Sequence, residues 1–341
     1  MRKNKTTALK TNTESEVAIR QENPFTRKKF LDMLSNVFFF TLIIGVCFAI
    51  LYPILTLLPM VFTDLRELGS PDAIWIPSKF GVNSLEFTFR SIMGGDATIM
   101  LKSILYAFAI CFIQVFMSAM AGYSLARTEF KGRNLVFFLV IFVFLVPRQS
   151  FLITQYLHFK HFDILGLFKL FLGHDIDLIN KPITLYLLAL FGFSVNQSLF
   201  IFIFRQFFKG LPVEIEEASL IDGAGFYKTY FKIMLPNAMP AILTVAVLAF
   251  VWAYGDTYYT NYFHTDGPYF GVIIDKTFKD GNNWYINNQA RLWFDTATTN
   301  DLAFEALKQA SIITFLTPLL ICYFFVQRKI VENLDRVGIV G

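Results

Sequence analysis

Long apolar segments recur along this chain, and shorter polar stretches separate them. A helix that crosses the hydrocarbon core of a bilayer needs about 20 mostly apolar residues, and several segments reach that length. They are spread over the whole chain instead of gathering into two soluble cores. The pattern predicts an all-α integral membrane protein with six transmembrane helices, at Ser35–Val61, Thr98–Leu125, Asn134–Thr154, Thr184–Phe208, Met239–Tyr262 and Phe304–Gln327.

The composition agrees with this class. Hydrophobic residues make up 55% of the 341 positions and charged residues only 16%, whereas soluble domains carry about a quarter charged residues. The net charge of +4 is ordinary for a membrane protein and does not indicate a nucleic-acid partner. Cys47, Cys111 and Cys322 all fall within predicted spans, where cysteine behaves as a small apolar residue. We therefore expect neither a disulfide nor a metal cluster.

The distribution of Lys and Arg predicts the orientation. With the N-terminus inside, the cytoplasmic segments carry more Lys and Arg than the outer loops, as the positive-inside rule requires. Both termini are then cytoplasmic. We expect a mostly disordered N-terminal tail of residues 1–33, a six-span membrane domain of residues 34–330 and a C-terminal tail of residues 331–341. The first apolar segment is too long for the core of a signal peptide, so we interpret it as a retained anchor.

The cytoplasmic loop 209–238, between the fourth and fifth predicted spans, has an ordered polar pattern. Pro212 suits the first turn of a helix. Three carboxylates follow near the positive end of that helix, where they are favoured: Glu214, Glu216 and Glu217. Gly223 then permits a sharp change of direction. The loop is predicted to begin with a short helix that ends in a bend.

A second helix is predicted after the bend, from Ala224 to about Leu235. Pro236 is expected to end it, and Pro240 falls within the first turns of the next span. The apolar side of this helix comprises Phe226, Tyr230, Phe231 and Ile233. Two interpretations of the helix–bend–helix are open. It can transmit force between a cytoplasmic domain and the helix bundle, or it can rest passively on lipid.

The spacing of residues in this loop resembles a known signature. Glu217-Ala218-Ser219, then Gly223, Ile233 and Leu235-Pro236 are similar to the EAA motif of permease subunits of bacterial ABC importers. Ser219 stands where that family usually has a second alanine. The wider run EEASLIDGAGFYKTYFKIMLPNAMPAI, preceded by FRQFFKGLPVEIEEA, resembles the sugar-importing branch typified by the maltose transporter. The likeness extends more weakly from the first predicted span to the end of the chain.

The resemblance implies an ABC importer type I permease fold and a transport subunit that is not itself an enzyme. The expected cargo is a sugar, in particular an oligosaccharide, and another polar solute is the alternative. The implied partners are a second permease subunit, two ABC ATPase subunits and an extracellular or periplasmic solute-binding protein. ATP and Mg bind to the ATPase subunits, so no cofactor is expected on this chain. The implied location is the bacterial plasma membrane.

The resemblance also implies roles for residues of the loop. In this family the EAA loop docks in a cleft of an ATPase and its glutamate, here Glu217, meets a basic residue. The residues expected to couple the chain to the ATPase are Glu216, Glu217, Ala218, Ser219, Asp222, Gly223, Ile233, Leu235 and Pro236. In the maltose-type branch the C-terminal tail reaches between the two ATPases. Asn333–Gly341 matches it in position, although a frayed terminus is an equal alternative.

Polar and aromatic side chains in the outer half of the spans are candidates for sugar contacts. Charged and amide side chains in a membrane tend to face a cavity, but they also form hydrogen bonds between helices, and aromatic residues near span ends serve as interfacial anchors. The candidates for the substrate path are Gln149, Asn196, Gln197, Trp252, Tyr254 and Asp256, with Arg148, Tyr156 and Tyr258 beside them.

The outer loops, about 62–97, 155–181 and 263–303, leave other interpretations open. Trp284, Tyr285 and Trp293 in the third loop fit contact with a soluble protein, and a structured lid is the alternative. His158 and His161 could hold a metal on one helical turn, or they could be solvated loop residues. A membrane-embedded enzyme is a further class, but the chain has no HExxH, no GxxxxGK[ST] loop and no nucleophile elbow.

Overall fold

The structure, a computed structural model, describes residues 27–64, 77, 79–279 and 301–338. In these residues it is helical throughout, with two isolated β-bridges, Thr63 to Phe80 and Phe162 to Ile176. The prediction of an all-α chain is confirmed. By its internal contacts the chain divides into two units, one made mainly of the first long helix up to Pro59 and the other made of most of the remainder.

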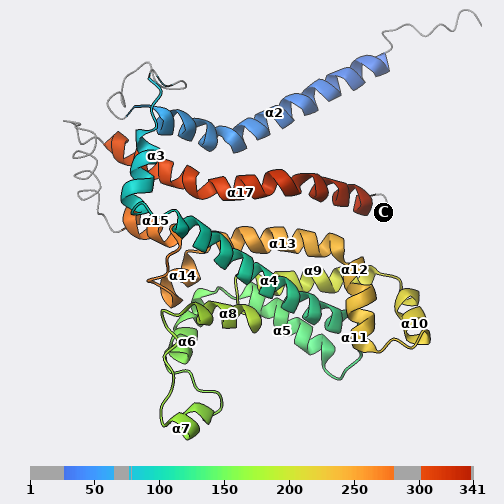
Figure 1. Cartoon of the computed structure of the whole chain (residues 1–341). Coiled ribbons are helices and arrows are strands. Elements are labelled where there is room, and N and C mark those ends of the chain that lie inside the picture. The colour runs from blue at the N-terminus through green and yellow to red at the C-terminus, as the bar shows by residue number, and fades with distance from the viewer. Residues whose placement is uncertain (1–26, 65–76, 78, 280–300, 339–341) are drawn as a thin grey trace, which may run out of the picture. The chain divides into compact units, whose positions relative to one another are not determined.

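Figure 1 shows the helices in chain order. They are α2 (Arg27–Phe62), α3 (Asn83–Phe87), η1 (Thr88–Ile92), α4 (Thr98–Arg127), α5 (Arg133–Leu145), α6 (Gln149–Lys160), α7 (Leu167–Leu172), α8 (Pro182–Leu190), α9 (Gln197–Gly210), α10 (Val213–Ile221), α11 (Phe226–Thr229), η2 (Tyr230–Met234), α12 (Leu235–Asn237), α13 (Met239–Tyr254), α14 (Tyr258–Phe263), α15 (Phe270–Lys279) and α17 (Asp301–Gly338).

Three of the predicted spans are single long helices. α2, α4 and α17 are each long and apolar enough to cross a membrane. Two bent pairs also pass this test when each is taken as one span: α5 with α6, which meet at 103°, and the segment Phe226–Asn237 with α13, which meet at 76°. The described residues therefore contain three to five candidate spans by length and composition.

Continuous helices were wrongly predicted at Asn134–Thr154, Thr184–Phe208 and Met239–Tyr262. The first is broken between α5 and α6, where Val146 is extended with ψ 130°, because a residue before proline is disfavoured in the helical region. The second is broken between α8 and α9, where Gly192 has φ +86° and Asn196 has φ +53°. The third is broken at Gly255, which follows α13.

Helices extend beyond the first and last predicted spans. α2 begins at Arg27, so residues 27–33 are helical and do not belong to a disordered tail. α17 continues to Gly338, so the predicted C-terminal tail, residues 331–341, is helical over most of its length. The N-terminal residues 1–26 and the aromatic residues of the third outer loop, Trp284, Tyr285 and Trp293, lie outside the described residues.

The core of the second unit is built around α4. This helix packs against α8, α9 and α13, and Figure 1 shows it running alongside them. Small side chains line these contacts, among them Ala119 on α4 and Ala249 on α13, both buried, and small residues allow helices in a membrane to approach closely. The larger fully buried side chains Phe200 and Phe204 of α9 fill the space between them.

Gly122 marks the closest approach of α4 to α9. A Cβ atom built there would lie 2.5 Å from the Cβ of Phe204 and 2.9 Å from the backbone nitrogen of Arg205. The first is attached directly to the backbone of α9 and the second is part of it, so neither can move aside without displacing that helix.

We expect Gly122→Ala to destabilise the protein by about 1–3 kcal/mol, because overpacking a close helix contact forces the backbone apart. The measurement is the thermal unfolding midpoint of the purified chain in detergent. Gly45→Ala on α2 is the matched control, since nothing lies within 4 Å of the added Cβ. Equal midpoints for the two variants would contradict the tight contact.

Candidate functional site

The predicted helix–bend–helix of residues 209–238 is present, with shifted boundaries. α10 begins at Val213, so Pro212 precedes its first turn and does not belong to it. The amide of Ala224 donates to the carbonyl of Ser219 at 3.1 Å, and the amide of Gly223 donates to that of Leu220 at 3.0 Å. This pair of bonds is a Schellman motif, which needs a left-handed residue after the helix. Gly223 supplies it with φ +74°.

The second half of the loop differs from the prediction. The helix begins at Phe226 and passes through Pro236 to Asn237, and the break before α13 falls at Ala238. Pro236 lies one residue before the end of this helix at Asn237, so the helix ends two residues later than predicted. Pro240 lies in the first turn of α13, as predicted.

Of the predicted apolar side of this second helix, Tyr230 is buried and Ile233 is half-buried, but the two phenylalanines are exposed. Phe226 and Phe231 are 47% and 43% exposed, whereas Tyr230 and Met234 are buried. The π-helical turn η2 adds a residue to one turn and so rotates the side chains that follow it.

The residues of the EAA-like signature fall into an exposed and an anchored group. Glu217, Ala218, Asp222, Gly223 and Pro236 are exposed, and Ile233 and Leu235 are half-buried. Ser219 is buried, and its hydroxyl lies 2.8 Å from that of Thr229. This hydrogen bond joins α10 to α11 across the bend. The exposed face of α10 also carries Leu220 and Ile221, so Glu217 stands beside apolar side chains.

Glu216 points inward, unlike Glu217. The hydroxyl of Tyr123, on α4, donates to Oε1 of Glu216 at 2.8 Å, and Nε of Arg127 lies 3.7 Å from Oε2. Tyr123 and Arg127 were not recognised from the sequence as part of the site. The signal was available: a tyrosine and an arginine one helical turn apart, at the end of a predicted span beside the loop.

A second set of polar side chains meets at the breaks in the helices. A small cavity of about 60 Å³ is lined by residues of α5, α6, α9 and the connections between them. Arg148, Asn196 and Gln197 of the predicted substrate path line it, together with Gln155 and Tyr259, which the sequence interpretation missed. Gln149 is exposed and does not line it. α6 carries several polar residues, so no pattern in the sequence singles out Gln155.

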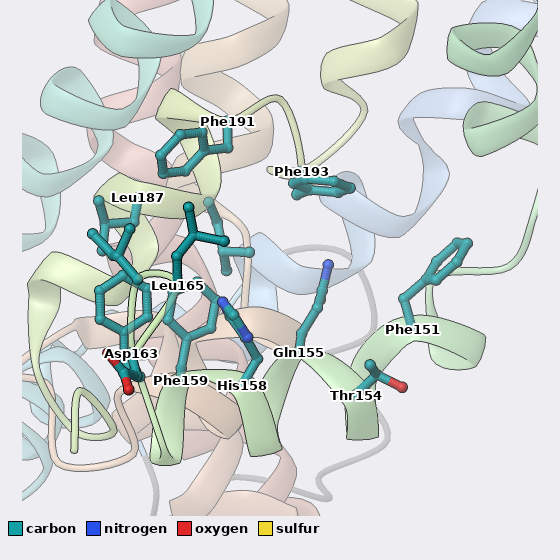
Figure 2. A pocket seen from close by; sticks show the side chains of 13 residues that line it. Phe151, Thr154, Gln155, His158, Phe159, Asp163, Leu165, Leu187, Phe191 and Phe193 are labelled. Carbon is teal, nitrogen blue, oxygen red and sulfur yellow. The ribbon is translucent and has the colours of Figure 1, made fainter. Parts of the chain in front are cut away.

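A larger groove of about 600 Å³ adjoins this cavity through shared residues, Phe151, Gln155 and Phe193. Figure 2 shows Gln155 extending from α6 toward Phe193 on the facing connection. The remaining lining is mainly aromatic and aliphatic, from α6, α8 and the segment before α7. No hydrogen bond within the described residues reaches the buried Oε1 of Gln155.

Several predicted substrate contacts have structural partners. Gln197, 1% exposed, donates to the carbonyl of Ala189 at 2.6 Å and accepts from the amide of Ser194 at 3.3 Å. The hydroxyl of Tyr254 donates to the carbonyl of Phe315 at 3.1 Å.

Asp256 and Trp252 also have partners within the protein. Asp256 accepts from the amides of Tyr258 and Tyr259 at 3.1 and 3.2 Å, before α14. Trp252 stacks on Phe200 with the ring centroids 5.5 Å apart. Tyr156, half-buried, packs against Phe263.

The two outer-loop histidines have separate surroundings. Nδ1 of His161 lies 2.8 Å from Oδ2 of Asp175, and this hydrogen bond holds the pKa of the Asp175 carboxyl below its usual value. His158 packs edge-on against Phe159 and Phe162. In the part of the chain that the structure describes, no group of three His, Cys, Asp or Glu side chains is placed to hold a metal ion.

Comparison with known proteins adds a family and a fold. Residues 114–336 match the family model described as binding-protein-dependent transport system inner membrane component. A crystal structure described as a bacterial ABC transporter involved in the import of the acidic polysaccharide alginate superposes with a TM-score of 0.66 and 19% identity, over 90% of this chain and 99% of that chain. The superposition supports the fold.

Three curated relatives illustrate the range of similar proteins. The diacetylchitobiose uptake system permease protein NgcG of Streptomyces coelicolor is 23% identical over 84% of this chain and 85% of its own length. The maltodextrin transport system permease protein MalD of Streptococcus pneumoniae is 25% identical over 87% and 92%. The osmoprotective compounds uptake permease protein GgtD of a Synechocystis species is 28% identical over 57% and 59%.

The bend at Gly223 gives a test of the loop geometry. We expect Gly223→Ala to lower the free energy of unfolding by about 1–2 kcal/mol, because a side chain is disfavoured in the left-handed region. The thermal unfolding midpoint measures this. Gly225→Ala is the matched control: both positions have open space around the added Cβ, but Gly225 has φ −71°. A similar midpoint for both would mean that the bend does not depend on glycine.

Proposed function

Because the chain belongs to the family of binding-protein-dependent transport system inner membrane components, we infer that it is the permease subunit of an ATP-driven ABC importer that moves a sugar into the cell. The observation that carries this proposal is the elbow formed by α10, Gly223 and α11. It presents Glu217 on an exposed surface while Glu216 and Ser219, on either side, are held by contacts with α4 and α11.

The elbow has the geometry that a docking element requires. Its exposed face combines a carboxylate with Leu220 and Ile221, and an apolar surface with one charge suits a partly desolvated interface with a basic partner. Ile233, Leu235 and Pro236 continue the elbow into α13. Movement of α10 by an ATPase is therefore delivered to the helix bundle, and closure of two ATPases around ATP drives the change in access.

The cargo is a carbohydrate, with an oligosaccharide as the leading candidate. Diacetylchitobiose and maltodextrin, named for two of the relatives, are both short saccharides. A third relative is named for the uptake of osmoprotective compounds, so another polar solute is the alternative cargo. The polar cavity beside Asn196 and Gln155 offers amide groups of the kind that bind sugar hydroxyls.

The complete importer contains further subunits. Two ATPase subunits bind ATP and Mg, a second permease completes the pathway, and an extracellular or periplasmic binding protein delivers the cargo. On this proposal the catalytic groups and the nucleotide sites belong to the ATPase subunits. Its membrane domain has six spans: α2, α4, the α5–α6 pair, the α8–α9 pair, α13 with α14, and α17. Both termini then lie in the cytoplasm, on the side of the elbow, in the bacterial plasma membrane.

Glu217→Lys is expected to abolish uptake while the amount of protein in the membrane stays at the wild-type level, because the reversed charge opposes a basic residue of the ATPase. The measurement is the uptake of radiolabelled diacetylchitobiose, maltodextrin and arabino-oligosaccharide by cells that carry the complete importer. Glu129→Lys, another exposed carboxylate in the connection after α4, is the control. Normal uptake by Glu217→Lys would remove the basis of the proposal.

Gln155→Leu is expected to raise the apparent KM for the transported saccharide about tenfold, which corresponds to one hydrogen bond worth about 1–1.5 kcal/mol. The same substitution at Gln149, on the exposed first turn of α6, serves as the control and should leave KM unchanged. If the two variants have the same KM, the cavity at the helix breaks is not part of the substrate path.

A further inference from the structure

The cluster of Tyr123, Arg127 and Glu216 has no part in the docking surface described above, yet it joins the elbow to the bundle. The side chain of Arg127 is 8% exposed and that of Glu216 is 19% exposed. Charged side chains with so little exposure are costly unless they are paired and hydrogen-bonded. Both conditions are met, because Glu216 also accepts the hydroxyl of Tyr123 at 2.8 Å.

Arg127 connects the cluster to α9 as well. Its Nε donates to the carbonyl of Phe208 at 3.0 Å, and Nη2 donates to the carbonyl of Leu211. The last carbonyls of a helix have no partner within it, and a guanidinium presents several donors in one rigid plane. One side chain thus joins the ends of α4 and α9 and faces the carboxylate on α10.

Tyr123 reinforces the junction through its ring. The ring centroid lies 5.3 Å from that of Phe208 on α9 and 5.0 Å from that of Tyr230 on η2. It also lies 5.6 Å from that of Phe226 on α11. Tyr123 therefore contacts both arms of the elbow, through its hydroxyl on α10 and through its ring on α11 and η2.

We propose that Tyr123, Arg127 and Glu216 are positioning residues that fix the elbow rigidly to α4 and α9, so that displacement of α10 moves both helices. This inference rests on the proposed function and adds the route by which force leaves the elbow. The route reaches the polar cavity along α9. That helix begins at Gln197, which lines the cavity, and ends at Gly210 beside the cluster, a length of about 20 Å.

The rigidity of the junction is tested first on the chain itself. The native cysteines Cys47, Cys111 and Cys322 are replaced by alanine, and spin labels are placed at Phe112→Cys on α4 and Ile221→Cys on α10, both on exposed positions. Double electron–electron resonance of the purified full chain in nanodiscs measures the distance distribution between the labels. Glu216→Gln and Tyr123→Phe are expected to widen it.

Glu214→Gln is the matched control, because Glu214 is an exposed carboxylate two residues earlier on the same helix and faces another side. It should leave the distribution narrow. The double variant Tyr123→Phe/Glu216→Gln should be no wider than the broader single variant, since residues that act as one unit are not additive. A narrow distribution in Glu216→Gln and Tyr123→Phe would overturn the proposal.

The second readout is coupling in the assembled importer. With the positioning residues altered and Glu217 intact, the ATPase subunits should still co-purify with the permease and hydrolyse ATP, while the saccharide transported per ATP falls. A merely structural role would reduce the amount of complex without changing this ratio. An unchanged ratio in Glu216→Gln would reject the positioning role. Only normal uptake in Glu217→Lys would reject the proposed function itself, so the two failures are distinguishable.

Discussion

A hydrocarbon bilayer offers no water to a free backbone group, so every interruption of a spanning helix must be satisfied by the protein itself. This chain interrupts its helices repeatedly, and polar side chains stand at the interruptions. Gln197 bonds to the carbonyl of Ala189 and the amide of Ser194 across the gap between α8 and α9. Arg127 bonds to the last carbonyls of α9. These polar residues in the apolar segments therefore supply hydrogen-bond partners to backbone groups where the helices break or end.

The same requirement limits what could be predicted from the sequence. The length of each apolar segment predicted the helical class and the continuous helices α2, α4 and α17, because hydropathy summed over a span is informative. It did not predict the breaks in the helices. Pro147 and Gly192 barely change the mean hydropathy of their segments, but they interrupt the helical backbone. In the loop 209–238, Gly223 predicted the bend correctly, since a left-handed turn after a helix favours glycine. The π turn η2 leaves no pattern in the sequence, so the burial of Met234, which lies at its end, was not predicted.

For the candidate site, residue type alone did not distinguish function from support. Trp252, Tyr254 and Asp256 were predicted as sugar contacts from residue type, and each also has a partner within the protein. Trp252 stacks on Phe200, Tyr254 donates to the carbonyl of Phe315, and Asp256 accepts two amides of the first turn of α14. Gln155 was overlooked although it lines both the cavity and the groove. The useful distinction is whether a buried polar atom already has a partner. An unpaired one, such as Oε1 of Gln155, has hydrogen-bonding capacity left for a ligand.

Ser219 shows how the elbow can depart from its usual sequence without losing stiffness. An alanine at this position would pack between α10 and α11 by its small size alone. The serine adds a hydroxyl, which is costly to bury without a partner, and Thr229 provides that partner at 2.8 Å. The departure therefore adds a hydrogen bond across the bend at Gly223, where only the backbone would otherwise join the two helices. Together with the contacts of Glu216 and Tyr123, it ties α10 to α11, η2 and α4, while Glu217 stays exposed.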